Sequence, residues 1–258
     1  MAELSISTKN CIVEQDGNVL IVTLNRPEAK NAFSPEMLLG MYKAWRLLEE
    51  DDGLYCAILT ANGDTFCAGM DLKAGADGEH RSTEEFMELM GKVPNIHWQA
   101  LLRDNRPNKP LILAVEGYAL AGGTEILQGT DIRVAADNAI FGVTEVARGL
   151  YPMSGSTVRL RRQIPYCLAA EILLCGEHIT AQQALDFGLV NKLVPPGETL
   201  AAAQEYAAKI CGNGPLAVRA VTRSLREHQE CMPEKDAMIA SDELAGPVFA
   251  SADAKEGM

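Results

Sequence analysis

Residues 18–60 read as a strand, a helix and a second strand, and this order limits the possible folds more than any other feature of the chain. Asn18–Leu24 and Leu54–Thr60 are short apolar runs typical of buried strands. Between them, Ser34 followed by a proline predicts the start of a helix that runs to about Glu50. Two strands joined by such a helical crossover lie parallel in one sheet, so the chain is predicted to be an α/β protein.

The alternation of strands and helices continues to about residue 196. The further strands that we predict are Pro110–Val115, Asp131–Ala135, Ile140–Val143 and Leu189–Val194, and the helices are Ser82–Gly91, Thr124–Leu127 and Ala181–Phe187. Beyond Pro196 the pattern is helical, over Leu200–Ile210, Pro215–Gln229 and Pro233–Leu244. We therefore expect a core domain over residues 1–196 and a helical segment over residues 197–258. A segment this short cannot bury a core alone, so it is expected to pack on the core or on a partner subunit.

The charge balance bears on the class of ligand. The 258 residues include 35 acidic and 23 basic side chains, a formal net charge of −12. Binding to nucleic acid or to an anionic membrane surface needs a basic footprint, so neither is expected. The seven cysteines are odd in number and show no C-x-x-C spacing, which favours free thiols in a cytoplasmic protein. The four histidines are scattered, so no metal site is predicted, and no apolar run is long enough to span a membrane.

A buried strand that runs into glycines and then a helix is the first candidate site. Pro110–Val115 leads into the run Gly117–Gly123, and Glu125 falls in the first turn of the helix. Glycines let a ligand approach the backbone, and a helix start presents free N–H groups that can bind an oxyanion or a polarised carbonyl. Taken alone, however, the pattern favours a tight turn with Glu125 as a surface acid that complements the helix dipole.

Two further segments could join this site. The glycine-containing loop Gly63–Lys73 also follows a strand, so its N–H groups could converge with those near Gly122 at one edge of the sheet; a plain surface loop is an equal alternative. Glu145 ends the short strand near Phe141, where a solvated acid is the simpler interpretation.

Taken together, five segments make the chain similar to the crotonase, or enoyl-CoA hydratase, superfamily. They keep the order and spacing of that family over essentially the whole chain: Leu24–Phe33, Phe66–Leu72, Gly117–Glu125, Phe141–Glu145 and Ile179–Val190. The resemblance implies a crotonase-like spiral of ββα turns with a C-terminal helical trimerisation segment. It also implies assembly as a homotrimer or a dimer of trimers, and an acyl-CoA thioester as substrate.

The resemblance further implies an oxyanion hole. Met70 and Gly122 stand at the matching positions, where their backbone N–H groups would bind the thioester oxygen and stabilise an enolate. For the rest of the acyl-CoA, it implies contacts from the segments around these positions. The residues so implied are Ala29, Lys30, Ala68, Asp71, Leu72, Lys73 and Gly123. The two lysines could offset the negative charge of CoA, although each could equally be a solvated surface residue.

Glu125 and Glu145 match the two glutamates of the hydratases in this family. Addition of water across an α,β-double bond requires that a water be deprotonated and the α-carbon protonated, and two carboxyl groups around one water can do both. The resemblance therefore implies reversible hydration of a trans-2-enoyl-CoA to a 3-hydroxyacyl-CoA, as in fatty acid β-oxidation, without a metal or redox cofactor. The alternative is Δ3,Δ2-enoyl-CoA isomerisation or another acyl-CoA reaction of the family; a third hypothesis is a non-catalytic acyl-CoA binder.

Overall fold

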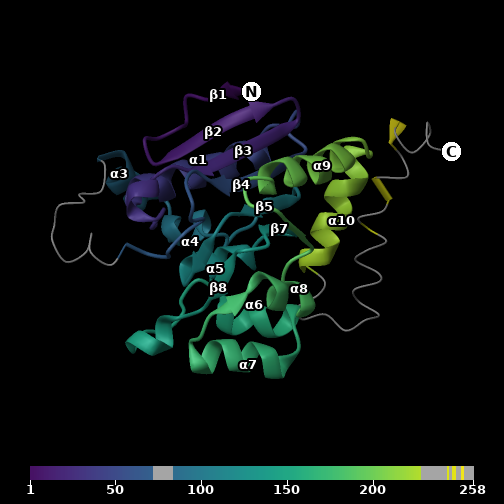
Figure 1. Ribbon diagram of the computed structural model, residues 1–258. Helices are drawn as coiled ribbons and strands as arrows, with labels where there is room; N and C mark the ends of the chain where they lie inside the picture. Colours follow the sequence, from purple (N-terminus) through teal and green to yellow (C-terminus); the bar gives the residue numbers. More distant parts are fainter. Residues whose placement is uncertain (72–83, 228–242, 244–245, 248–250, 253–258) are drawn as a thin grey trace.

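A large, mostly parallel sheet forms the centre of the computed structural model, which describes residues 1–71, 84–227, 243, 246–247 and 251–252 (Figure 1). Its strands run in the order β1-β2-β3-β4-β5-β7-β10. They are β1 (Ala2–Glu3), β2 (Cys11–Asp16), β3 (Val19–Leu24), β4 (Cys56–Ala61), β5 (Leu111–Val115), β7 (Ile132–Ala136) and β10 (Lys192–Val194). The pairs from β3 to β10 are parallel, which confirms the predicted α/β class, whereas β1 and β2 form an antiparallel edge.

A second, smaller sheet gives the chain its ββα turns. It contains β6 (Tyr118–Leu120), β8 (Ile140–Gly142) and β9 (Ile179–Thr180). Thus β5, β6 and the following helix α5 (Gly122–Leu127) make one turn, with one strand in each sheet, and β7, β8 and the helical region after them make the next. Because β6 and β8 are parallel, the segments that follow them leave the small sheet on the same side.

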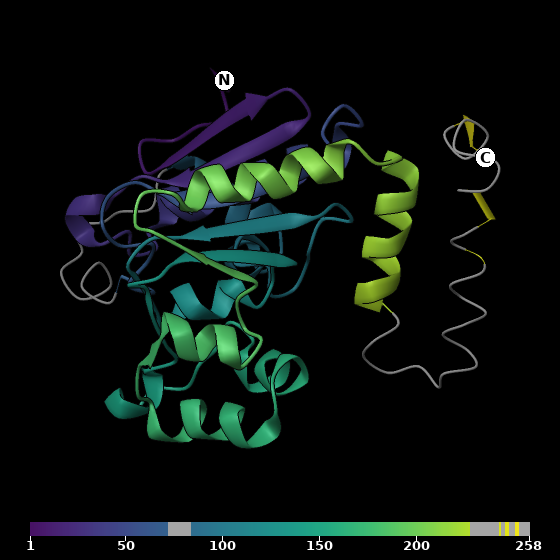
Figure 2. The ribbon, with the colours of Figure 1, turned by 45° about the vertical axis from the view of Figure 1, so that its right-hand side comes forward.

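The other helical elements lie outside the two sheets. They are η1 (Pro27–Ala29), α1 (Pro35–Glu50), α3 (Glu84–Lys92), α4 (Ile96–Ala100), η2 (Glu145–Arg148), α6 (Ser156–Gln163), α7 (Tyr166–Cys175), α8 (Ala181–Asp186), α9 (Thr199–Cys211) and α10 (Pro215–Glu227). The helix α10 projects away from the sheets (Figure 2). In the part of the chain that the structure describes, none of the helices is long and apolar enough to cross a bilayer.

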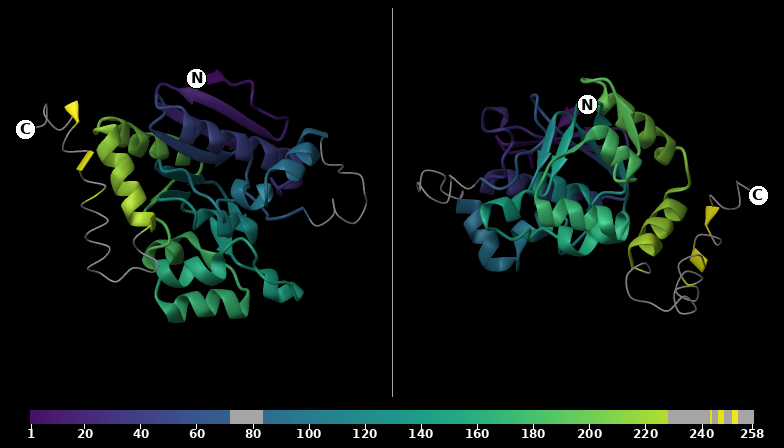
Figure 3. Two further views of the ribbon diagram at one scale, coloured as in Figure 1. Left: turned by 180° about the vertical axis from the view of Figure 1, so that it is seen from behind. Right: turned by 60° about the horizontal axis from the view of Figure 1, so that its bottom comes forward.

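The large sheet is buried on both faces, as its unbroken apolar strands require. In β5, Leu111 and Leu113 face the main core, whereas Ile112 and Ala114 face the opposite side. The helix α1 packs on the first face and α9 on the second (Figures 2 and 3). The first part of residues 197–258 therefore packs on the core, one of the two expected arrangements.

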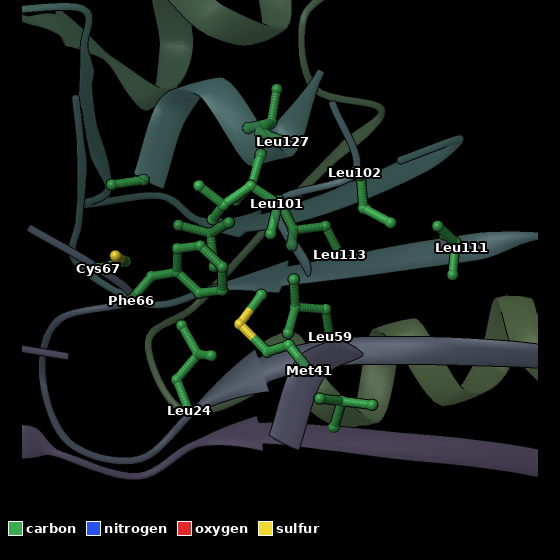
Figure 4. Close-up of a cluster of buried hydrophobic side chains, with 14 of the residues drawn as sticks. Leu24, Met41, Leu59, Phe66, Cys67, Leu101, Leu102, Leu111, Leu113 and Leu127 are labelled. Carbon is green, nitrogen blue, oxygen red and sulfur yellow. The ribbon is translucent and has the colours of Figure 1, made fainter. Parts of the chain in front are cut away.

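Phe66 ties a candidate loop into the main core. Its side chain is fully buried and points into the same space as Met41, Leu59 and Leu113 (Figure 4). Burial of a phenylalanine contributes about 2–3 kcal/mol. The chain immediately after Phe66 is therefore held against the sheet.

Most predicted elements are confirmed to within two residues. The Ser34 side chain accepts a hydrogen bond from the Met37 N–H at 3.2 Å, as a helix N-cap does. The strand β2 was not predicted. The helix α5 begins at Gly122 rather than at Thr124, because a helix start rich in glycine gives a weak propensity signal. The predicted cap of α3 at Ser82 lies outside the described residues. Of the predicted helix Pro233–Leu244, residue 243 alone is described, and it is helical.

Candidate active site

The loop after β4 lies beside β6, so two separate glycine segments come together. Isolated bridges pair Thr65 with Gly117 and Cys67 with Ala119. The Leu120 N–H also donates to the Cys67 carbonyl at 2.9 Å. The predicted convergence of the two loops at one edge of the sheet is confirmed, because both follow neighbouring parallel strands.

The two backbones approach so closely that side chains would not fit between them. A Cβ on Gly69 would lie 3.2 Å from the Leu120 carbonyl oxygen and 3.3 Å from the Gly122 N, and a Cβ on Gly123 would lie 2.4 Å from the Cys67 carbonyl oxygen. Gly69 itself has φ +97°, a conformation that favours glycine. Close packing of main chain on main chain therefore explains Gly69 in one segment and Gly123 in the other.

Two backbone N–H groups are left available where these segments meet. Within the described residues, neither the Met70 nor the Gly122 N–H donates to a protein acceptor. Gly122 is the first residue of α5, so its N–H lies at the positive end of the helix. The preceding Ala121 has φ +50° and ψ −121°, an unfavourable conformation for a residue with a Cβ. The bond from its N–H to the Gly142 carbonyl, at 2.7 Å, holds it there.

Glu125 is buried, so its interpretation as a surface acid is wrong. Only 2% of the residue is exposed. Its Oε1 atom accepts hydrogen bonds from the Ser154 N–H at 3.0 Å and from the Ser156 N–H at 3.1 Å, and its Oε2 atom lies 3.1 Å from the Ser154 N. Backbone N–H donors stabilise negative charge on a carboxylate, and they fix its orientation. The loop at residues 154–156 comes from distant sequence, so no local pattern around Glu125 indicated this burial.

Glu145 is the first residue of η2 and is half-buried rather than fully solvated. Burial raises the pKa of Glu145 to about 7, and the neighbouring Glu125 carboxyl adds to the shift through its charge and through a hydrogen bond between the side chains. Within the described part of the chain, the buried Oε2 atom of Glu145 has no protein partner. Two facing carboxyl groups, one with backbone donors and one that gains a proton near neutral pH, can accept and donate a proton in turn.

Asp71 forms an ion pair with Arg26. Its Oδ2 atom accepts a hydrogen bond from Arg26 Nη1 at 2.6 Å. Nearby, the buried Asn31 accepts a hydrogen bond from the Arg26 N–H at 2.7 Å and donates to the Thr65 carbonyl at 2.7 Å. Arg26 and Asn31 thus join the segment before α1 to the loop after β4. Both lie within a segment that the sequence marked as similar to the family, but their role as anchors depends on contacts across the fold.

The remaining residues implied to bind CoA are on or near the same surface loops. Ala68 is exposed, Ala29 is partly buried, and the Ala68 N–H donates to the Lys30 carbonyl at 3.0 Å. The Lys30 ammonium forms an exposed ion pair with Asp64 at 2.9 Å. Leu72 and Lys73 lie outside the described residues.

The comparisons with known proteins agree over almost the whole chain. The profile of the family described as enoyl-CoA hydratase/isomerase matches residues 14–258. The enoyl-CoA hydratase EchA19 of Mycobacterium tuberculosis is 51% identical over 251 residues, which are 97% of this chain and 92% of that protein. The short-chain-enoyl-CoA hydratase of Clostridium acetobutylicum is 36% identical, over 96% of this chain and 93% of that protein.

Solved structures of similar sequence share the fold. The crystal structure of an enoyl-CoA hydratase from Mycobacterium tuberculosis aligns with a TM-score of 0.84 at 44% identity, covering 97% of this chain and 94% of that chain. The enoyl-CoA hydratase EchA1 from Mycobacterium marinum aligns with a TM-score of 0.85 at 42% identity, with the same coverage.

Proposed function

This chain belongs to the enoyl-CoA hydratase/isomerase family, and we propose that it is an enoyl-CoA hydratase that adds water reversibly to a trans-2-enoyl-CoA to give a 3-hydroxyacyl-CoA. The observation that carries this proposal is the pair of facing carboxyl groups, Glu125 and Glu145, beside the free N–H group at the start of α5. The curated relatives named as hydratases, at up to 51% identity among those compared, support the same reaction.

The backbone N–H groups of Met70 and Gly122 bind the thioester carbonyl oxygen in this proposal. When water adds to C3 of the substrate, the electrons of the double bond move onto that oxygen and form an enolate. Two fixed donors that stabilise the developing charge lower the barrier by roughly 3–4 kcal/mol each. Because the donors belong to the main chain, the Met70 side chain does not take part, and its 45% exposure leaves it at the mouth of the site.

The two glutamates divide the proton transfers. Glu125 is oriented by the Ser154 and Ser156 N–H donors, and in this proposal it removes a proton from the attacking water. Glu145, which gains a proton near neutral pH, delivers that proton to C2. The hydroxyl oxygen is then bonded to C3, and the proton left on Glu125 passes to Glu145 to restore the starting state.

The rest of the acyl-CoA contacts the loops around the oxyanion hole. We assign this role to Ala29, Lys30, Ala68 and Gly123, with Leu72 and Lys73 proposed from the sequence alone. Asp71 supports the same loop through its ion pair with Arg26. CoA is part of the substrate, and acid–base chemistry of this kind calls for no further cofactor.

We also propose that the enzyme works in the cytoplasm as a homotrimer or a dimer of trimers. All six cysteines in the described residues are free, which suits a reducing compartment. On α10, Leu216, Val221 and Leu225 are each about half exposed, and apolar side chains of this kind on one helix suit contact with another subunit.

Loss of the enoyl-thioester absorbance tests the reaction directly. Purified protein with crotonyl-CoA is expected to lose this absorbance rapidly, and Glu125→Gln or Glu145→Gln is expected to lower kcat about 100- to 10,000-fold. Glu171→Gln, which removes an exposed carboxylate on α7, serves as the matched control and should keep normal turnover. Normal turnover by either of the first two variants would contradict the proposed roles.

A second substrate distinguishes hydration from the alternative reaction, isomerisation of a 3-enoyl-CoA. A 3-enoyl-CoA is presented under the same conditions, and appearance of the conjugated absorbance reports isomerisation. Conversion of the 3-enoyl-CoA without hydration of crotonyl-CoA would show that the protein is an isomerase and not a hydratase.

A further inference from the structure

Gln128, a fully buried residue directly after α5, contacts both ends of α6. Its side-chain Nε2 donates to the Ser156 hydroxyl at 2.8 Å, at the first residue of α6. Its backbone carbonyl accepts a hydrogen bond from Gln163 Nε2 at 2.9 Å, at the last residue of α6. The residue that caps the helix holding Glu125 thus binds the first and the last residue of α6.

The start of α6 is the part that holds the Glu125 carboxylate. Ser154 and Ser156 donate their backbone N–H groups to it, and both residues are buried. The position of these donors depends on where the loop sits relative to α5. The Gln128–Ser156 bond joins that loop to α5 directly, one helical turn beyond Glu125.

A buried arginine extends this support to the large sheet. Gln163 Oε1 accepts a hydrogen bond from Arg133 Nη2 at 3.0 Å, and Arg133 is a residue of β7 that also donates to the Leu189 carbonyl at 3.0 Å. The polar contacts therefore run without a break from the sheet through α6 to the loop that donates to Glu125. Such a network fixes positions more strictly than apolar packing, because each contact has a direction.

Packing alone does not explain a glutamine side chain at position 128. Its Oε1 atom is buried and, in the part of the chain that the structure describes, has no hydrogen-bond partner. An unpaired buried oxygen is unfavourable, and an apolar side chain of similar shape would avoid it. The amide at this position is therefore explained by what its Nε2 group does.

We propose that Gln128 and the Ser156 hydroxyl are positioning residues for the hydration reaction, which hold the two N–H donors in the geometry that orients Glu125. This inference rests on the proposed function. Neither side chain contacts the reacting atoms; both act through the loop at residues 154–156. Misplacement of a catalytic group by about an ångström lowers turnover up to about 100-fold.

The first test removes only the Ser156 hydroxyl. Ser156→Ala keeps the N–H donor but deletes the contact with Gln128, and kcat with crotonyl-CoA is expected to fall about 10- to 100-fold with KM changed less than about threefold. The alkaline limb of the kcat/KM profile should move to higher pH, because a Glu125 charge that is less well compensated by N–H donors raises the pKa of the neighbouring Glu145 further. Thr222→Val is the matched control: it deletes a buried hydroxyl that bonds within α10, and neither kcat nor the pH profile should change.

A double-mutant cycle gives an independent measure. Gln128→Met removes the same contact from its other side with little change in shape, so the double variant with Ser156→Ala should be no slower than the slower single variant. The inference would be overturned if the fold decrease in kcat of the double variant equalled the product of the decreases in the two single variants. A normal kcat and pH profile in Ser156→Ala would also overturn it.

The same assays separate this inference from the proposed function. If the wild-type protein fails to hydrate crotonyl-CoA, or Glu125→Gln is fully active, the hydratase mechanism fails. If those results hold and the Gln128 and Ser156 variants behave as wild type, the positioning role alone is wrong.

Discussion

The Arg26 guanidinium donates to the Asp71 carboxylate at 2.6 Å, and the two side chains are only 10% and 11% exposed. Asp71 directly follows Met70, one of the two proposed oxyanion donors. On the other side of Met70, the Gly69 carbonyl accepts a hydrogen bond from the Phe33 N–H at 2.8 Å. An ion pair between distant segments therefore fixes the residue whose N–H group must face the substrate.

Loss of this ion pair is expected to weaken both stability and turnover. Arg26→Gln removes the ionic contact with the largely buried Asp71 carboxylate, so the free energy of unfolding should fall by about 3–5 kcal/mol in urea titrations. The folded fraction should also show a lower kcat, because Met70 is less firmly held. Lys192→Gln removes the exposed ion pair with Glu205 and should cost less than about 1 kcal/mol. Equal losses in the two variants would show that burial of the Arg26 pair is unimportant.

The stability of the protein should depend on the proton of Glu145. Its ordinary pKa of 4.5 is raised to about 7, so between these values the native state retains a proton that the unfolded state has released. The free energy of unfolding therefore falls as pH rises through this range. Glu145→Gln removes the dependence: relative to wild type, the variant should gain about 1 kcal/mol between about pH 5 and pH 8, a value reduced for partial solvent exposure. A difference that stays flat with pH would refute the prediction.

Activity should depend on pH over the same region. The mechanism needs one proton on the pair Glu125 and Glu145, so kcat/KM for hydration should fall as pH rises through about 7. The dehydration of a 3-hydroxyacyl-CoA should follow the same profile, because the ratio of the two directions equals the equilibrium constant for a reaction that releases no proton. Initial rates in both directions, in buffers from about pH 5 to pH 9, provide the measurement. A kcat/KM that stays level as pH rises through about 7, in either direction, would be incompatible with a shared proton.

Gly123→Ala should disturb the contact between the two loops. The new Cβ would lie 2.4 Å from the Cys67 carbonyl oxygen, which belongs to the backbone and cannot turn aside. We expect a loss of about 1–3 kcal/mol in the free energy of unfolding and a lower kcat. Gly91→Ala in α3 meets no atom within 4 Å and should be neutral or slightly stabilising. Thermal unfolding and crotonyl-CoA turnover of both variants test the contrast.

Lys30 offers a test of CoA recognition apart from chemistry. Its ammonium is exposed and, among the residues that the structure describes, pairs with Asp64 at the surface, so Lys30→Ala should leave kcat near normal. With crotonyl-CoA the KM should rise about three- to tenfold, because one positive charge near the CoA phosphates is lost. With a crotonyl thioester of N-acetylcysteamine, which lacks the phosphates, KM should be unchanged. A rise in KM with both substrates would place Lys30 elsewhere in the mechanism.

Local patterns in the sequence were sufficient for much of the fold. The cap at Ser34 and the apolar run of β5 are encoded by neighbouring residues, so both are read directly from the chain. The strand β2 was missed because its alternation of apolar and polar residues is short and interrupted, and its place is set by pairing with β1 and β3. The convergence of the two glycine segments followed from chain direction alone, since parallel strands end at one edge.

The chemical state of the site was not encoded locally. Glu125 reads as a surface acid in its own helix, and its burial comes from a loop 29 residues further along the chain. The shift in the pKa of Glu145 likewise depends on desolvation by the packed fold and on the Glu125 charge. The order of residues along the chain specifies which backbone and carboxyl groups are present and the order of the elements that carry them. Which carboxyl group receives N–H donors and which receives a proton depends on the folded arrangement, because burial and charge–charge interactions are properties of groups brought together in space.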